Sequence, residues 1–177
     1  MLFRLVSGCA LAAMTMGAAM AQDMSGSGAM SDVNSSPSAY VTAAGQSDQF
    51  EIQEGQMAQS MGKSAAVRTF GARMVKEHTM STKMVMKAAM KSGLPQMPPP
   101  PLRPDQQQMM TQLQSMSGAD FDKTYVQQQL QAHQQALQLQ QGYSQGGTDP
   151  NLKLAASKIV PVIQEHLSML QSMPGAM

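Results

Sequence analysis

Residues 93–104 read GLPQMPPPPLRP, and this stretch decides how the rest of the chain can fold. Proline fixes its own φ angle and lacks a backbone N–H, so the segment cannot be helical, and its run of consecutive prolines favours extended polyproline II. On both sides of it the chain is rich in alanine, glutamine and methionine, which favour helices. The proline-rich stretch therefore divides a helical chain into two halves.

Each half is predicted to form two long helices separated by a short turn. Glycines mark the ends of helices at Gly62 and Gly146, while Ser64 and Asp149 are suited to cap the helices that follow. A shorter helix is predicted between the proline-rich stretch and the third long helix. The predicted helices span residues 38–61, 64–91, 105–116, 119–144 and 149–172.

The connections between these helices predict the topology. Short turns make each half an antiparallel hairpin. The link between the halves combines an extended segment, at ~3.1 Å per residue, with a short helix, so it reaches about 55 Å and can run the full length of the bundle. Such a crossover is typical of ferritin-like bundles. The sequence thus predicts an all-α fold, a ferritin-like four-helix bundle over residues 38–173 with a long Pro-rich crossover that contains a short extra helix.

The first 21 residues resemble a signal peptide. Arg4 supplies a positive start, an apolar stretch follows, and Ala-Met-Ala at 19–21 matches the pattern that signal peptidase recognises. Cleavage after Ala21 would deliver the chain to the periplasm or the exterior. A lipoprotein-like ending at Cys9 lies too close to Arg4 for an ordinary apolar region, and whether Cys9 is lipidated stays open. Residues 22–37, rich in Gly, Ser and Asp, are predicted to be a disordered tether.

Composition excludes several classes of function. Loss of Arg4 with the leader lowers the Lys+Arg count from 12 to 11, equal to the 11 Asp+Glu, so the mature chain is formally neutral. A neutral chain with only 13% charged residues is poorly suited to nucleic acid. No later apolar run approaches the ~20 residues of a membrane helix. We expect no nucleic-acid partner and no transmembrane segment in the mature chain, with an envelope protein as one candidate partner.

The three histidines carry the main functional hypothesis. His78, His133 and His166 each lie on the apolar face of a different predicted helix, and the first helix offers Glu51, with Glu54 beside it. Imidazole and carboxylate together suit Fe, Mn, Zn or Cu. The leading hypothesis is an exported binding or envelope-stress protein that holds a transition metal on Glu51, His78, His133 and His166.

A purely structural or interaction module is the alternative, in which buried histidines are hydrogen-bonded and set the register of the helices. Folding each hairpin about its turn places His78 opposite Ser47, about one turn from Glu51. The same operation places His133 opposite Pro161, more than a turn from His166. The predicted register of the hairpins therefore does not by itself bring these residues into a compact metal site.

Diiron chemistry is not predicted. Ferritin-like diiron sites take Glu-x-x-His from each of two helices, but Val75 and Ile163 occupy the positions three before His78 and His166. Glu77 instead directly precedes His78, about 100° away around the helix. We assign no catalytic residues and expect the protein not to be an enzyme.

Methionine supports a second alternative. Of 20 methionines, five crowd the second predicted helix, at 74, 80, 84, 86 and 90. Thioethers are soft ligands for Cu(I), so an exported Met-rich chain could act as a copper buffer. The competing interpretation is that methionine fills the helical core.

Glutamines dominate the third long helix, between residues 127 and 141. They are predicted to form an uncharged, solvated face. A lateral interface with a partner is the alternative.

Several motifs together resemble one known family. EIQEGQMA at 51–58 and VRTFGARMVKEH at 67–78 resemble the first half of the bacterial domain-of-unknown-function 4142 family, and SGADFD at 117–122 with IVP at 159–161 resemble its second half. The resemblance implies a ferritin-like exported bundle of the outer membrane or periplasm, without an established activity. The family's recurring positions fall on Glu51, His78, Asp122, His133 and His166. Glu77 is a mild departure, because the family more often has Asp before that histidine.

Overall fold

The computed structural model describes residues 33–175, and every regular element in this range is a helix. The helices are α2 Pro37–Met61, α3 Ala65–Lys91, α4 Pro104–Gln114, α5 Gly118–Gly146 and α6 Pro150–Gln171. The predicted all-α class is confirmed, and each helix ends within two residues of its predicted bounds. Residues 33–35, which the prediction gave to the tether, are helical. The predicted leader, its cleavage site and Cys9 lie outside the described residues.

The helices begin where the predicted caps are. The Ser64 hydroxyl accepts a hydrogen bond from the Val67 N–H at 3.2 Å, and an Asp149 carboxylate oxygen accepts one from the Leu152 N–H at 2.9 Å. Each bond satisfies a backbone donor that has no partner within the helix. Capping thus explains why both turns stay short.

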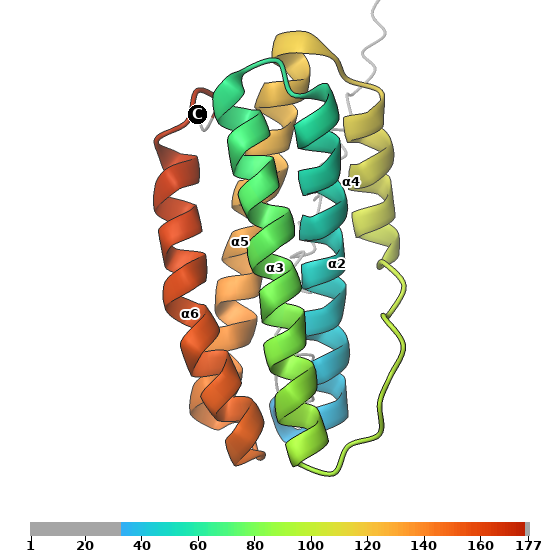
Figure 1. Cartoon of the computed structure of the whole chain (residues 1–177), viewed down its shortest axis with the longest axis vertical. Helices are drawn as coiled ribbons and strands as arrows, with labels where there is room; N and C mark the ends of the chain where they lie inside the picture. Colours follow the sequence, from blue (N-terminus) through green and yellow to red (C-terminus); the bar gives the residue numbers. More distant parts are fainter. Residues whose placement is uncertain (1–32, 176–177) are drawn as a thin grey trace, which may run out of the picture.

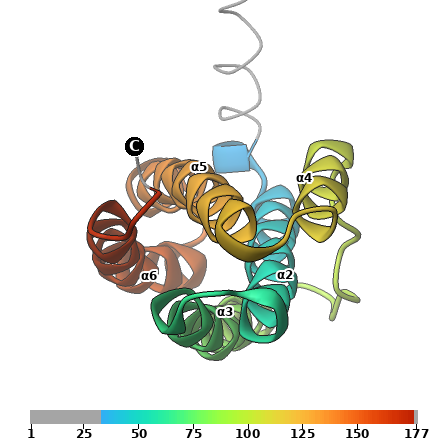
Figure 2. The ribbon, with the colours of Figure 1, turned by 90° about the horizontal axis from the view of Figure 1, so that it is seen from above.

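The four long helices lie side by side, and neighbours run antiparallel (Figure 1). Seen from above, α2, α3, α6 and α5 follow one another around a ring (Figure 2). The proline-rich segment after α3 runs back along the outside, and α4 rests on α2 and α5. The link from α3 therefore returns the chain to the opposite end, where α5 begins.

The α2–α3 pair is the closest-packed part of the bundle because glycines face each other there. A Cβ atom on Gly71 would lie 2.7 Å from the Cβ of Ala58 and 2.7 Å from the carbonyl oxygen of Gly55. Real Cβ atoms do not come this close, so both positions require glycine. The contact brings the carboxylates of α2 close to α3.

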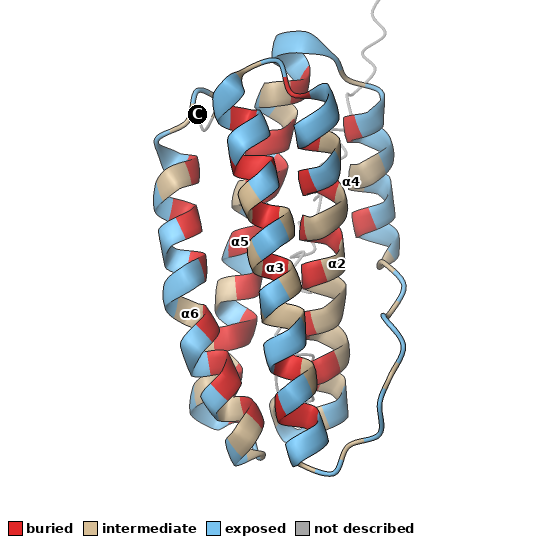
Figure 3. Cartoon of the chain, viewed as in Figure 1, coloured by how far each residue is buried: buried red, intermediate tan, exposed pale blue. Residues whose placement is uncertain are grey.

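Buried residues, red in Figure 3, lie on the inward faces of all four long helices. They form two apolar clusters, one around Tyr40, Tyr143 and Ile163, the other around Phe70 and Phe121. Between them, every long helix contributes buried polar side chains. This polar layer consists of Asp48, Glu51, Glu54, His78, Gln128, Gln129, His133 and His166.

Replacing Gly71 by alanine should test the close α2–α3 contact. We expect Gly71→Ala to lower the free energy of unfolding by about 1–3 kcal/mol, because the new methyl group forces the helices apart. Urea denaturation followed by circular dichroism measures this. In the control, Gly146→Ala, the nearest atom would be an amide nitrogen of Asn34 at an ordinary 3.5 Å. A loss of stability in Gly146→Ala as large as in Gly71→Ala would contradict the interpretation.

Candidate metal centre

The three histidines meet in the middle of the bundle. The ring centroids of His133 and His166 are 5.2 Å apart, and His78 lies 5.5 Å from the first and 5.7 Å from the second. One ring nitrogen from each residue falls within 4.8 Å of the others. All three residues are at most 4% exposed. The separation of more than a turn expected for His133 and His166 is therefore wrong, since these two rings are in direct contact.

Each ring is held by one acceptor on its outer side. His78 Nδ1 lies 2.9 Å from Asp48 Oδ1, and His166 Nε2 lies 2.6 Å from Glu77 Oε2. His133 Nδ1 lies 2.9 Å from the carbonyl oxygen of Gln129. A carboxylate or carbonyl oxygen only accepts, so each of these ring nitrogens carries the proton. The tautomer of every neutral ring is thereby set.

The remaining nitrogen of each neutral ring has a free lone pair. His133 Nε2 and His166 Nδ1 face each other at 3.2 Å, and His78 Nε2 is buried without a hydrogen-bond partner. Two lone pairs at this distance repel unless a proton or a cation is shared between them. Histidine ligands in metal sites have this arrangement, with one N–H bound to a carboxylate or carbonyl and the other nitrogen turned to the ion.

Two fully buried glutamates from α2 border the histidines. Glu51 Oε1 lies 3.3 Å from His133 Nδ1, and neither oxygen of Glu51 accepts a hydrogen bond. Glu54, one turn further along, accepts a hydrogen bond from the Gln129 side-chain amide at 2.8 Å, and its other oxygen has no partner. The hydroxyl of Tyr125 is also buried and unpaired. Glu51 thus touches the cluster at the outer, proton-bearing nitrogen of His133 and lies outside the group of three convergent ring nitrogens, whereas Glu54 is tied to α5.

Burial dominates the ionisation of the glutamates. It raises the pKa of Glu51 to about 7, although the nearby His78 acts in the opposite direction. It also raises the pKa of Glu54 well above its ordinary value. A carboxylate in a dry layer is costly when charged, so a neighbouring cation would stabilise both groups.

Burial has the opposite effect on two of the histidines. It lowers the pKa of His133 far below its usual range and lowers that of His166 as well, so both are neutral near pH ~7. At His78, burial also lowers the pKa, but Asp48 and Glu51 together outweigh it and the net shift is upward. His133 and His166 are therefore already in the form that binds metals.

The sequence profile of a family described as "Domain of unknown function (DUF4142)" matches residues 19–173. The chain belongs to this family. No curated protein and no solved structure matches the chain. The family description assigns no activity, so the DUF4142 chain must be interpreted from its own geometry.

The structure brings together most of the positions that the DUF4142 resemblance singled out. Glu51, His78, His133 and His166 share the polar layer. Asp122 does not, because its two carboxylate oxygens accept hydrogen bonds from the backbone N–H groups of Lys63 and Ser64, each at 2.8 Å. Asp122 therefore holds the α2–α3 turn against α5.

Sequence reasoning missed three residues of the centre. Asp48 lies three positions before Glu51 and hence on the same face of α2, a spacing that could have revealed it. Glu77 is 100° from His78 on its own helix but bonds to His166 on another, which only the packing of α3 against α6 can show. Gln129 is fully buried, and Gln128 and Gln140 are also buried, so the expected solvated glutamine face is wrong at these three positions.

No helix among residues 33–175 combines the length and apolarity required to cross a membrane.

Replacing Glu51 by glutamine should remove a pH-dependent cost of folding. The pKa of Glu51 is about 7 in the native state against 4.5 ordinarily, so its contribution to stability is complete below the lower value and is lost as pH rises through the higher one. In the metal-free protein we expect the stabilities of Glu51→Gln and wild type to match at about pH 4. By about pH 8, the variant should be more stable by roughly 3 kcal/mol.

Denaturation with a chelator present measures this difference. Because Glu51 also raises the pKa of His78, the pKa of His78 is measured by NMR in both proteins and its contribution is subtracted before the difference is assigned to Glu51. A difference that does not change with pH would show that Glu51 keeps an ordinary pKa.

Proposed function

We propose that this DUF4142 chain is an exported metal-binding protein, whose ferritin-like bundle holds one transition-metal ion on His78, His133 and His166, with Glu51 as the adjoining carboxylate. The proposal rests on one observation above all. Three imidazoles from three helices bring one ring nitrogen each within 4.8 Å of the others, and each ring is fixed from behind by an acceptor.

The donor set indicates the class of ion. Imidazole nitrogens suit Zn, Cu, Fe and Ni, and a carboxylate within reach suits the same ions in their divalent form. The described polar layer contains no thiolate. A divalent ion on three neutral imidazoles would also stabilise the unpaired oxygens of Glu51, because opposite charges attract strongly where water is absent.

Topology and the leader support the rest of the proposal. The order of the long helices around the ring and the long crossover between α3 and α5 support the ferritin-like part of the proposal, because such a crossover is typical of those bundles. The leader-like residues 1–21 support export, where a chain meets metal ions from the surroundings.

Loss of one histidine should abolish metal binding. We expect wild type purified from the periplasm or loaded with Zn²⁺ to hold about one ion per chain. His133→Gln removes a proposed ligand, so its affinity for Zn²⁺ should fall by more than ~100-fold, the upper end of what is lost when only a residue behind a ligand is changed. Asp48→Asn, which alters only the partner of His78, should lose about 10–100-fold. Elemental analysis and competition with a chromophoric chelator measure both.

A buried polar residue outside the centre supplies the control. Gln140 accepts a hydrogen bond from the Tyr40 hydroxyl at 2.6 Å in the apolar cluster around Tyr143. Gln140→Leu should lower stability and leave metal binding unchanged. If wild type binds no ion, or if His133→Gln binds as wild type does, the structural alternative holds and the histidines set only the register.

A second candidate function follows from where the methionines lie. Four of them are exposed large apolar residues, namely Met61, Met80, Met84 and Met90, with Met80 and Met90 each 56% exposed. Because these four side chains are exposed, the interpretation that methionine fills the helical core does not explain them. Met80 and Met84 are one turn apart on α3, as two thioether ligands of one Cu(I) ion would be.

Replacing the four exposed methionines by leucine should test copper buffering. Leucine keeps helix propensity and apolar character but has no sulfur. We expect the variant to bind fewer Cu(I) ions at saturation than wild type, with Zn²⁺ binding unchanged. Equal Cu(I) binding by both proteins would rule this function out.

A further inference from the structure

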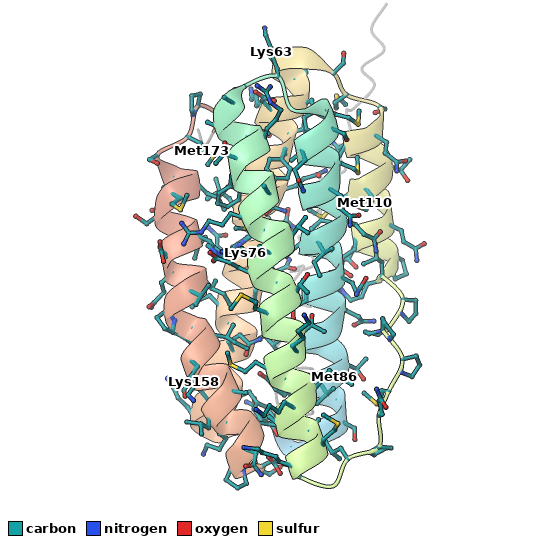
Figure 4. All side chains as sticks on the ribbon, in the orientation of Figure 1. Lys63, Lys76, Met86, Met110, Lys158 and Met173 are labelled. Atoms are coloured by element: carbon teal, nitrogen blue, oxygen red, sulfur yellow. The ribbon has the colours of Figure 1, made fainter. Side chains whose placement is uncertain are left out.

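Hollows mark the seam between α3 and α6. A groove of about 350 Å³ is lined from α3 by Glu77, Met80 and Met84 and from α6 by Ile159, Val162 and Glu165, among others. Figure 4 labels Lys76 and Lys158, which also line this groove. A second hollow further along the seam includes Arg73 and Met169.

Glu77 connects this groove to the histidines. Its Oε2 lies 2.6 Å from His166 Nε2, and its side chain is 23% exposed, whereas His166 is 1% exposed. Glu77 is thus at once a wall of the groove and a direct partner of the metal centre.

Arg73 closes the seam over Glu77. Its Nε donates to Glu77 Oε1 at 2.9 Å, and a terminal nitrogen donates to Glu165 Oε1 on α6 at 2.7 Å. The other terminal nitrogen lies 3.0 Å from the sulfur of Met169. One guanidinium therefore joins α3 to α6 and occupies the free oxygen of Glu77.

The other faces of the bundle offer no comparable connection. The α2–α3 seam is closed at Gly55 and Gly71, which leave no room for a side chain between the helices. Farther along this seam, a hollow lined by Gln49 and Thr82, among others, leads to His78 only through the buried Asp48, which accepts a hydrogen bond from Thr82 at 2.9 Å. The hollow beneath α4 is lined by Phe50, Gln106 and Gln135, among others, and within residues 33–175 none of its lining residues hydrogen-bonds to a histidine. Access from water to the histidines is therefore shortest through Glu77.

We infer that a divalent metal ion reaches and leaves the histidine centre through the α3–α6 groove, with Arg73 as a latch and Glu77 as the positioning residue that receives the ion before His166. This inference rests on the proposed function. The incoming cation and the guanidinium compete for the same carboxylate, so Arg73 must leave Glu77 before an ion can bind there. The latch sets the rate of exchange, whereas the histidines set the affinity.

Arg73→Ala tests the latch against a matched control, Lys158→Ala. Both remove one positive charge from the same seam, but only Arg73 bonds to Glu77. With Zn²⁺ alone and a chromophoric chelator in stopped flow, we expect Arg73→Ala to speed both uptake and release by about fivefold to tenfold, the effect of a few partly exposed polar contacts. The equilibrium constant should change far less than either rate, and Lys158→Ala should behave as wild type. Equal changes in the rates of Zn²⁺ uptake and release in both variants, or no change in either, would contradict the role of Arg73 as a latch.

Blocking the groove tests the route itself. In a Cys9→Ala background, Val162→Cys labelled with a bulky maleimide should slow Zn²⁺ uptake at least about tenfold, and Gln135→Cys labelled beside α4 should not. Unchanged uptake in the labelled Val162→Cys protein would refute the route while leaving the centre intact. Failure of the unlabelled wild type to bind Zn²⁺ at equilibrium would instead refute the proposed function.

Discussion

The cost of keeping charged and polar groups out of water is the constraint on which the rest of this structure depends. A band of carboxylates, amides and imidazoles crosses the bundle between two apolar clusters. Each buried polar group costs free energy unless it finds a partner. The bundle reduces this cost by placing hydrogen-bond partners on different helices. Asp48 on α2 pairs with His78 on α3, and Glu77 on α3 pairs with His166 on α6. The polar layer thereby ties together helices that the apolar clusters alone would let slide.

The apolar clusters make such a layer tolerable. Stacked Tyr40 and Tyr143 anchor one end, and Phe70 packs edge-on against Tyr125 and His166 at the other. The favourable free energy of burying these aromatic side chains offsets the cost of burying the polar layer. The close glycine contact between α2 and α3 has the same effect, because it lets carboxylates of one helix reach side chains of the next. Asp48, for example, bonds to both His78 and Thr82 on α3.

Sequence reasoning succeeded where the physics is local. Caps at Ser64 and Asp149 and the proline-rich stretch define the helices, and helical periodicity turns each histidine inward, as the structure confirms. Register within the α2–α3 hairpin was also close, since His78 was expected opposite Ser47 and binds Asp48. The predicted register of the α5–α6 hairpin was less accurate. The helix α5 continues to Gly146, beyond its predicted end at residue 144, and this shifts His133 toward His166.

Contacts between the halves could not be predicted from the sequence. Glu77 with His166 and Gln129 with Glu54 depend on how one hairpin docks on the other, and no local pattern encodes that docking. Glutamine is usually at the surface, so the sequence predicted that Gln129 would be exposed to solvent, whereas it is buried. The acceptor role of Gln129 and its amide donation to Glu54 emerge only once α2 and α5 are in contact.

The pattern of satisfied and unsatisfied atoms separates the two interpretations of the histidines. A layer that only sets register gains most when every donor meets an acceptor, because each unpaired buried atom costs ~1–3 kcal/mol. Here the outward nitrogens are all paired, yet His78 Nε2 and both oxygens of Glu51 are unpaired. Carboxylate and amide oxygens predominate among the unpaired atoms of the layer, although the hydroxyl of Tyr125, which can also donate, is unpaired as well. An excess of acceptors in a dry interior would attract a cation, and this excess is the argument for the proposed metal centre over a structural network.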